Sequence, residues 1–163
     1  MFNLNVVLHE PLIPQNTGNI ARTCAAVGAK LHLIKPLGFR LDSRDLKRAG
    51  LDYWPLVDFC VHKNFSELLT AHPATNMAFL TKKASRTYDS INFSGDLFLV
   101  FGNEEGGLPS HILRQYQDRC FRIPMGAGAR SLNLASAATV VIYEALRQNG
   151  FPGLELRGEM PDR

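Results

Sequence analysis

The feature that most constrains the fold is an alternation of short apolar runs with segments of helical periodicity. Leu97-Phe98-Leu99-Val100-Phe101 is the strongest apolar run, and a glycine ends it. Short apolar runs bounded by Gly or Pro predict buried strands, and a Gly after a periodic segment predicts the end of a helix. We therefore expect strands at 5–9, 30–34, 57–61, 77–81, 97–101 and 121–123, and helices at 18–27, 43–49, 64–71, 109–116 and 134–148.

Helices between buried strands predict an α/β fold, with a mostly parallel sheet and helices on both of its faces. A length of 163 residues fits one domain. We assign this domain to residues 1–153 and treat 154–163, rich in Gly, Pro and charge, as a frayed C-terminal tail. The three cysteines are odd in number and far apart, so each is expected to be a small buried thiol in a reducing compartment.

The composition excludes several classes of protein. The N-terminus lacks the cationic and apolar segments of a signal peptide, and no apolar run approaches the roughly 20 residues of a membrane span. We therefore expect a cytoplasmic protein without a membrane partner. The histidines show neither H-x-x-H nor H-x-x-x-H spacing, so no metal site is expected. A net charge of +3 permits an anionic partner without requiring one.

Ligands of parallel sheets bind beyond the carboxyl ends of the strands, so the loops there are the candidate sites. In the first such loop, Asn16, Asn19 and Arg22 recur every three residues and project from one side of a helix start. A capping role accounts for Asn16. It leaves unexplained a second Asn and an Arg, which could bind a phosphate or carboxylate. A capped helix with a surface Arg and an anion site therefore remain equal alternatives.

Two further loops carry unusual sequence. Residues 102–107 read Gly-Asn-Glu-Glu-Gly-Gly, which permits either close approach of a ligand to the backbone or an acidic turn before a helix. Residues 125–133 contain Gly126-Ala127-Gly128 but lack the third glycine of a dinucleotide fingerprint. Ser131 or Asn133 could also simply cap the last helix.

Taken together, the three loops resemble the three motifs of the SPOUT superfamily of RNA methyltransferases. The matching segments are Asn16-x-Gly18-Asn19-x-x-Arg22, Phe101-Gly102-Asn103-Glu104 with Gly107-Leu108-Pro109, and Ile123-Pro124-Met125 with Ser131-Leu132-Asn133-Leu134. Other segments are similar to the minimal TrmL (YibK) family, among them Glu10-Pro11, Leu37-Gly38-Phe39 and Arg48-Ala49-Gly50-Leu51-Asp52-Tyr53. The likeness covers the chain from about Asn5 to Gly153.

The resemblance implies an α/β-knot fold with a C-terminal trefoil knot, a homodimer, and S-adenosylmethionine as cofactor. It implies 2'-O-methylation of the wobble nucleotide (position 34), a cytidine or modified uridine, in leucine tRNAs. Asn103 and Ala135 depart from the family pattern, which usually has Pro and Ser there. Methylation of another tRNA site or of rRNA is therefore the alternative, and a non-catalytic RNA-binding module is a further one.

The resemblance also assigns roles to residues. It implies that the cofactor is bound by Leu80, Gly102, Ile123, Met125 and Ser131, that catalysis uses Arg22, Ser131 and Asn133, and that Asn16, Asn19, Glu104 and Tyr143 contact substrate. Glu104 is also expected to order the loops. A guanidinium group hardly ever loses its proton, so we expect Arg22 to stabilise the forming alkoxide and bind the adjacent phosphate.

Two surfaces could contact the expected partners, tRNA and a second copy of the chain. Cationic side chains near the three loops are expected to contact tRNA phosphates: Arg40, Arg44, Lys47, Arg48, Lys82, Lys83, Arg86, Arg119, Arg122 and Arg130. Small residues at 135–138, continued by Val141 and Ala145, would let the last helix pack closely against a second copy. The same residues could instead pack in the core of one chain, and the sequence leaves both possibilities open.

Overall fold

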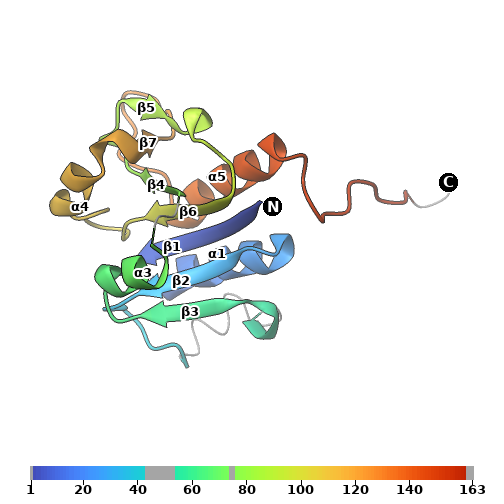
Figure 1. Cartoon of the computed structure of the whole chain (residues 1–163), viewed down its shortest axis with the longest axis horizontal. Coiled ribbons are helices and arrows are strands. Elements are labelled where there is room, and N and C mark those ends of the chain that lie inside the picture. The colour runs from blue at the N-terminus through green and yellow to red at the C-terminus, as the bar shows by residue number, and fades with distance from the viewer. Residues whose placement is uncertain (1, 43–53, 74–75, 161–163) are drawn as a thin grey trace.

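A seven-stranded sheet, in the order β3-β2-β1-β6-β4-β7-β5, organises the computed structural model, which describes residues 2–42, 54–73 and 76–160 (Figure 1). Every strand pairing among these residues is parallel. The strands are β1 (Asn3–His9), β2 (Lys30–Ile34), β3 (Phe59–His62), β4 (Asn76–Leu80), β5 (Arg86–Thr87), β6 (Asp96–Phe101) and β7 (Cys120–Arg122). The predicted α/β fold with a mostly parallel sheet is thus confirmed.

The helices are α1 (Pro14–Val27), α3 (Phe65–Ala71), α4 (Ser110–Gln115) and α5 (Leu134–Gln148). β2 and α5 have the predicted bounds, and Gly28 ends α1 in the left-handed conformation that a glycine tolerates. α1 begins four residues before the predicted start, at Pro14, whose fixed φ suits a first helical position. β5 was not predicted, because two residues carry no periodicity. The predicted helix at 43–49 lies outside the described residues.

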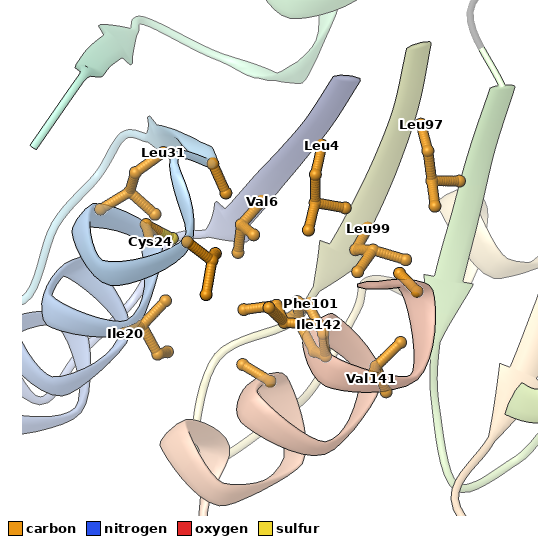
Figure 2. Close-up of a cluster of buried hydrophobic side chains, with 14 of the residues drawn as sticks. Leu4, Val6, Ile20, Cys24, Leu31, Leu97, Leu99, Phe101, Val141 and Ile142 are labelled. Carbon is orange, nitrogen blue, oxygen red and sulfur yellow. The ribbon is translucent and has the colours of Figure 1, made fainter. Parts of the chain in front are cut away.

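The two faces of the sheet are covered by different helices. Side chains alternate between faces along each strand, so Val6, Leu99 and Phe101 face α1 and α5. Figure 2 shows these three among the side chains of one apolar cluster, together with Cys24 of α1 and Ile142 of α5. The other face packs against α3 and α4 through a second cluster: Val7, Ile34, Leu68, Met77, Phe79, Ala84, Phe98, Val100, Leu108, Ile112 and Cys120. The prediction of helices on both faces is confirmed.

The small residues of α5 turn inward. Ala135, Ala138, Val141 and Ala145 are buried in the core of this chain, which is the single-chain alternative that the sequence left open for them. Residues 154–160 form no helix or strand and run away from the sheet (Figure 1). Within the described ranges, no helix has the length and apolar character needed to cross a membrane.

The cysteines do not share one environment. Cys24 and Cys120 are buried, as predicted. Cys60 is only half-buried on the edge strand β3, and its Sγ lies 3.1 Å from Nδ1 of His32. The prediction of a small buried apolar residue is therefore wrong for Cys60. Among the strands that the structure describes, β3 has a neighbour on one side only, and that neighbour, β2, carries a histidine beside Cys60.

The turn that follows β6 closes on itself with no room for a side chain. A Cβ placed on Gly102 would lie 2.0 Å from the carbonyl carbon of Gly107 and 2.2 Å from the nitrogen of Leu108. Both contacts are to backbone, so relief requires movement of the whole turn. Gly102 is thus needed for the close approach of residues 102 and 107–108.

We expect Gly102→Ala to lower the free energy of unfolding by about 1–3 kcal/mol, the usual cost of overpacking. Gly106→Ala is the matched control in the same turn, because its Cβ would meet nothing nearer than 3.6 Å. The control should stay within about 0.5 kcal/mol of the parent chain. Urea unfolding followed by circular dichroism measures both, and equal stabilities for the two variants would contradict the packing argument.

Candidate active site

A cavity of about 360 Å³ opens beyond the carboxyl ends of β4, β6 and β7. Its walls come from the segments 80–83, 101–108 and 123–137, with the start of α1 closing one side. Parallel sheets bind their ligands at this end. Among its lining residues are eight of the predicted site residues: Asn16, Leu80, Gly102, Glu104, Ile123, Met125, Ser131 and Asn133.

The carboxylate of Glu104 joins the β6 loop to the start of α1. Its Oε2 accepts a hydrogen bond from the backbone N–H of Leu12 at 2.8 Å. Its Oε1 accepts from the backbone N–H of Ile13 and from Nδ2 of Asn16, both at 3.1 Å. Both oxygens of Glu104 thus receive hydrogen bonds from the protein, as expected for a side chain that orders the loops, while its predicted contact with substrate stays a prediction. The geometry therefore gives this side chain a role in ordering the loops.

The side chain of Asn16 bridges the two other loops. Its Nδ2 donates to Glu104, and its Oδ1 accepts from Nδ2 of Asn133 at 2.9 Å. Asn16 itself is 6% exposed, and both of these bonds are partly buried. Of the two alternatives for this loop, the one in which Asn16 caps α1 is excluded, because the helix begins earlier and Asn16 lies within its first turn. At the capping residue Ile13, no side-chain cap is found in the described structure.

Asn133 holds the third loop at the start of α5. Its Oδ1 accepts from the backbone N–H groups of Ala135 at 2.9 Å and Ser136 at 3.2 Å, which makes it the N-cap of the helix. Of the two possible caps, the structure thus selects Asn133. Ser131 precedes this cap by two residues, is exposed, and lines the cavity. The hydroxyl of Ser131 is consequently available to a bound molecule.

Three predicted site residues lie elsewhere. Among the described residues, the cavity lining does not include Asn19, Arg22 or Tyr143. All three are exposed, the first two on α1 and the third, 47% exposed, on α5. α1 and α5 pack side by side there, with the hydroxyls of Thr23 and Thr139 3.4 Å apart. One chain alone therefore does not bring these side chains to the cavity.

The predicted cationic side chains have mixed surroundings. Lys82 and Lys83 line the cavity, and Nζ of Lys82 donates to the backbone oxygen of Arg130 at 3.1 Å. The guanidinium of Arg86 lies 4.6 Å above the ring of Phe121. Arg40 forms a salt bridge with Asp42 at 2.9 Å, which reduces its availability to a phosphate. Arg44, Lys47 and Arg48 lie outside the described residues.

Several lining residues were not predicted. Thr81, Leu132, Leu134 and Ala137 also line the cavity. Leu134 and Ala137 are three residues apart in the first turn of α5, and this spacing on a helix that follows a candidate loop could have indicated them. The lining thus combines apolar side chains with amide, hydroxyl and backbone groups, which suits a small molecule with both apolar and polar parts.

The chain is similar to known methyltransferases along most of its length. The model of the SpoU rRNA Methylase family matches residues 3–143. A Yersinia pestis protein described as tRNA (cytidine(34)-2'-O)-methyltransferase is 45% identical over 160 residues, covering 94% of this chain and 99% of that protein.

Solved structures of methyltransferases are also similar to this chain. One, described as giving structural insights into the 2-OH methylation of C/U34 on tRNA, superposes with a TM-score of 0.87 at 45% identity, over 91% of this chain and 97% of that one. An AdoMet-bound rRNA methyltransferase from Sinorhizobium meliloti has a TM-score of 0.81 at 28% identity, over 90% of this chain and 56% of that one. With three joined loops around one cavity and a family match from residue 3 to residue 143, the chain belongs to the SpoU methylase family of SPOUT methyltransferases.

Proposed function

We propose that this chain transfers the methyl group of S-adenosylmethionine to the ribose 2'-hydroxyl of the wobble nucleotide, position 34, of tRNA. The observation that carries the proposal is the chain of side-chain contacts Glu104–Asn16–Asn133, which joins three distant segments around one cavity. Relatives at 45% identity that cover nearly the whole chain support the choice of nucleotide. Restriction to leucine tRNAs, with a cytidine or modified uridine at the wobble position, is the narrower form of the proposal. A cytoplasmic location follows from this substrate.

The cavity suits the proposed cofactor. Its volume of about 360 Å³ is within the range of small-molecule sites, and apolar side chains make up part of its wall. Leu80, Gly102, Ile123, Met125 and Ser131 would hold S-adenosylmethionine, which supplies an electrophilic methyl group on a sulfonium centre. The backbone at Gly102 can come close to a ligand because no side chain intervenes.

The protein's own contribution is positioning and charge. We assign to Arg22 the stabilisation of the negative charge that develops on the ribose oxygen, together with binding of the adjacent phosphate. Nδ2 of Asn133 has two hydrogens; one is donated to Asn16, and we assign the other to the ribose. Ser131 orients the cofactor. Glu104 is a positioning residue, since its oxygens hold the start of α1.

A homodimer would bring the missing side chains to the cavity. Ser136, Val140 and Tyr143 lie along one outward side of α5, and Val140 and Tyr143 are 40% and 47% exposed. Ile13 and Leu132 at the cavity wall are 42% and 41% exposed. We propose that this apolar surface packs against a second copy, and that Tyr143 and Arg22 serve the cavity across that interface.

We further infer a trefoil knot near the C-terminus, as the family resemblance implies. Support comes from the path of the chain: β7 lies beside β4, and residues 123–133 then share the cavity wall with 101–108 before α5 returns to pack on α1. The knot would fix the relative positions of the two cavity loops.

The substrate assignment is tested with labelled S-adenosylmethionine and total tRNA from a strain that lacks wobble ribose methylation, followed by nucleoside mapping. Label at the 2'-oxygen of position 34 supports the proposal. Label at another tRNA site, or in rRNA alone, would establish the alternative substrate. Absence of both label and S-adenosylhomocysteine binding would identify a non-catalytic RNA-binding protein.

Arg22→Ala should lower the rate of methyl transfer by about 100-fold or more, the usual effect of losing a donor to a developing oxyanion. Its affinity for S-adenosylhomocysteine should change little, because Arg22 does not line the cavity of the described chain. Arg114→Ala on α4, also exposed, is the control and should retain full activity. A fully active Arg22→Ala enzyme would remove Arg22 from the mechanism.

Asn16→Asp should weaken S-adenosylhomocysteine binding about tenfold to a hundredfold at neutral pH, as expected for a loss of about 1–3 kcal/mol. The new carboxylate cannot donate to Glu104 and repels it, which raises the pKa of the pair. Acidification should therefore restore part of the affinity, since a protonated carboxyl can donate again. Asn19→Asp makes the same change on the exposed side of α1 and should bind normally by calorimetry.

Val140→Lys should convert the dimer to a monomer, because an ammonium group at a packed apolar surface loses its hydration. Sedimentation should then give a mass near 18.1 kDa, in place of twice that value for the parent chain. Gln115→Lys on exposed α4 is the control and should remain dimeric. A Val140→Lys variant that stays dimeric would exclude this surface as the interface.

A further inference from the structure

A cluster of nitrogen and sulfur donors lies away from the cavity, where β2 pairs with the edge strand β3. His32 of β2 is the direct neighbour of Cys60 in the parallel ladder, and His62 follows two residues later on β3. Residues two apart on a strand point to the same face, so all three side chains converge on the face covered by α3. His32 is fully buried, His62 is 7% exposed, and Cys60 is half-buried.

The three donor atoms have the spacing of a coordination sphere. Nδ1 of His32 lies 3.0 Å from Nε2 of His62, and Sγ of Cys60 lies 3.1 Å and 3.3 Å from these nitrogens. A tetrahedral Zn²⁺ with the usual bond lengths requires its nitrogen and sulfur ligands to be about 3.3–3.6 Å apart. An expansion of a few tenths of an ångström would therefore admit the ion.

The ring of His32 is oriented for metal binding by a second set of contacts. Its Nε2 lies 3.1 Å from Oδ1 of Asn5, whose Nδ2 faces the backbone oxygen of Leu97 at 3.4 Å. The amide oxygen thus accepts the Nε2 proton, so the lone pair is on Nδ1, the atom that faces Cys60 and His62. Metal-binding histidines typically donate their second ring N–H in this way.

Burial also shifts the pKa values of the three side chains. Burial lowers the pKa of His32 to about 3, and His62 and His72 act in the same direction. Burial likewise lowers the pKa of His62. Neutral imidazole is the form that binds a metal. Burial raises the pKa of the Cys60 thiol.

We propose that His32, Cys60 and His62 bind one Zn²⁺ ion, with a water molecule as the fourth ligand. Cys60 releases its thiol proton to solvent on binding, since thiolate is the form that coordinates the metal. Within the described part of the chain β3 pairs only with β2, so the ion would fasten this sheet edge to its neighbour. The site would serve stability, separately from methyl transfer. The alternative is a hydrogen-bonded triad that binds no metal.

The test uses the full chain, stripped with a chelator and titrated with Co²⁺ as a spectroscopic probe for Zn²⁺. One equivalent should produce visible bands of a tetrahedral ion and a near-ultraviolet band from thiolate-to-cobalt charge transfer. Cys60→Ala should lose the charge-transfer band, and His62→Gln should bind far more weakly. Cys120→Ala, which removes a different thiol, should behave as the parent chain.

A second readout is thermal unfolding. Stoichiometric Zn²⁺ should raise the Tm of the parent chain and of Cys120→Ala, but not that of Cys60→Ala, because an ion that binds only the folded state stabilises it. Methyl transfer should be the same with and without the ion. If no charge-transfer band forms at one equivalent, or if the band persists in Cys60→Ala, the cluster is a hydrogen-bonded triad and the proposal fails.

Discussion

The cavity depends on one buried amide, that of Asn16. The group donates to the carboxylate of Glu104 on one side and accepts from the amide of Asn133 on the other, and a carboxamide offers both a donor and an acceptor. Asn16 lies in α1, Glu104 in the β6 loop and Asn133 in the segment before α5. Along the chain, Asn16 is 88 residues from Glu104 and 117 residues from Asn133. A single side chain thus fixes the mutual positions of loops that have no sequence proximity, and the cap of α5 at Asn133 is ordered by the same contact.

The two faces of the sheet bury different kinds of side chain. The face toward α1 and α5 is packed almost entirely with apolar side chains, and the methyltransferase cavity lies at its carboxyl edge. The opposite face, toward α3, buries Asn5, His9, His32 and His62 beside aromatic rings. Because neighbouring residues of a strand point to opposite faces, β2 can contribute Leu31 and Leu33 to the core and His32 to a polar cluster without conflict.

Local signals predicted the elements well, and the contacts between them poorly. Three features were predicted correctly because each depends on residues that are near in sequence: the strand at 30–34, the helix at 134–148 and the glycine that ends α1. For these, the local pattern of apolar residues and glycines was sufficient. A capping role was one of two alternatives for Asn16, since capping is the local use of an Asn. Its partners in the structure, Glu104 and Asn133, lie in loops that only the folded chain brings near. The cluster of Cys60 and His62 with His32 was missed for the same reason. His32 comes from the adjacent strand, so the spacing of residues within one segment does not indicate the cluster.

The central position of β1 has a consequence for synthesis of the chain. β1 pairs with β2 soon after both emerge, yet its other neighbour is β6, and Asn3 is 93 residues from its partner Asp96. Until the ribosome has made residue 101, one side of β1 presents unpaired amide and carbonyl groups, and an exposed strand edge is a template for wrong association. The part of the apolar face that α5 covers stays exposed until that helix is complete at Gln148. Long-range pairing of this kind is slow to form and leaves apolar surface open to association, so β1 and the face beneath α5 depend on segments that are made late in this stretch of chain.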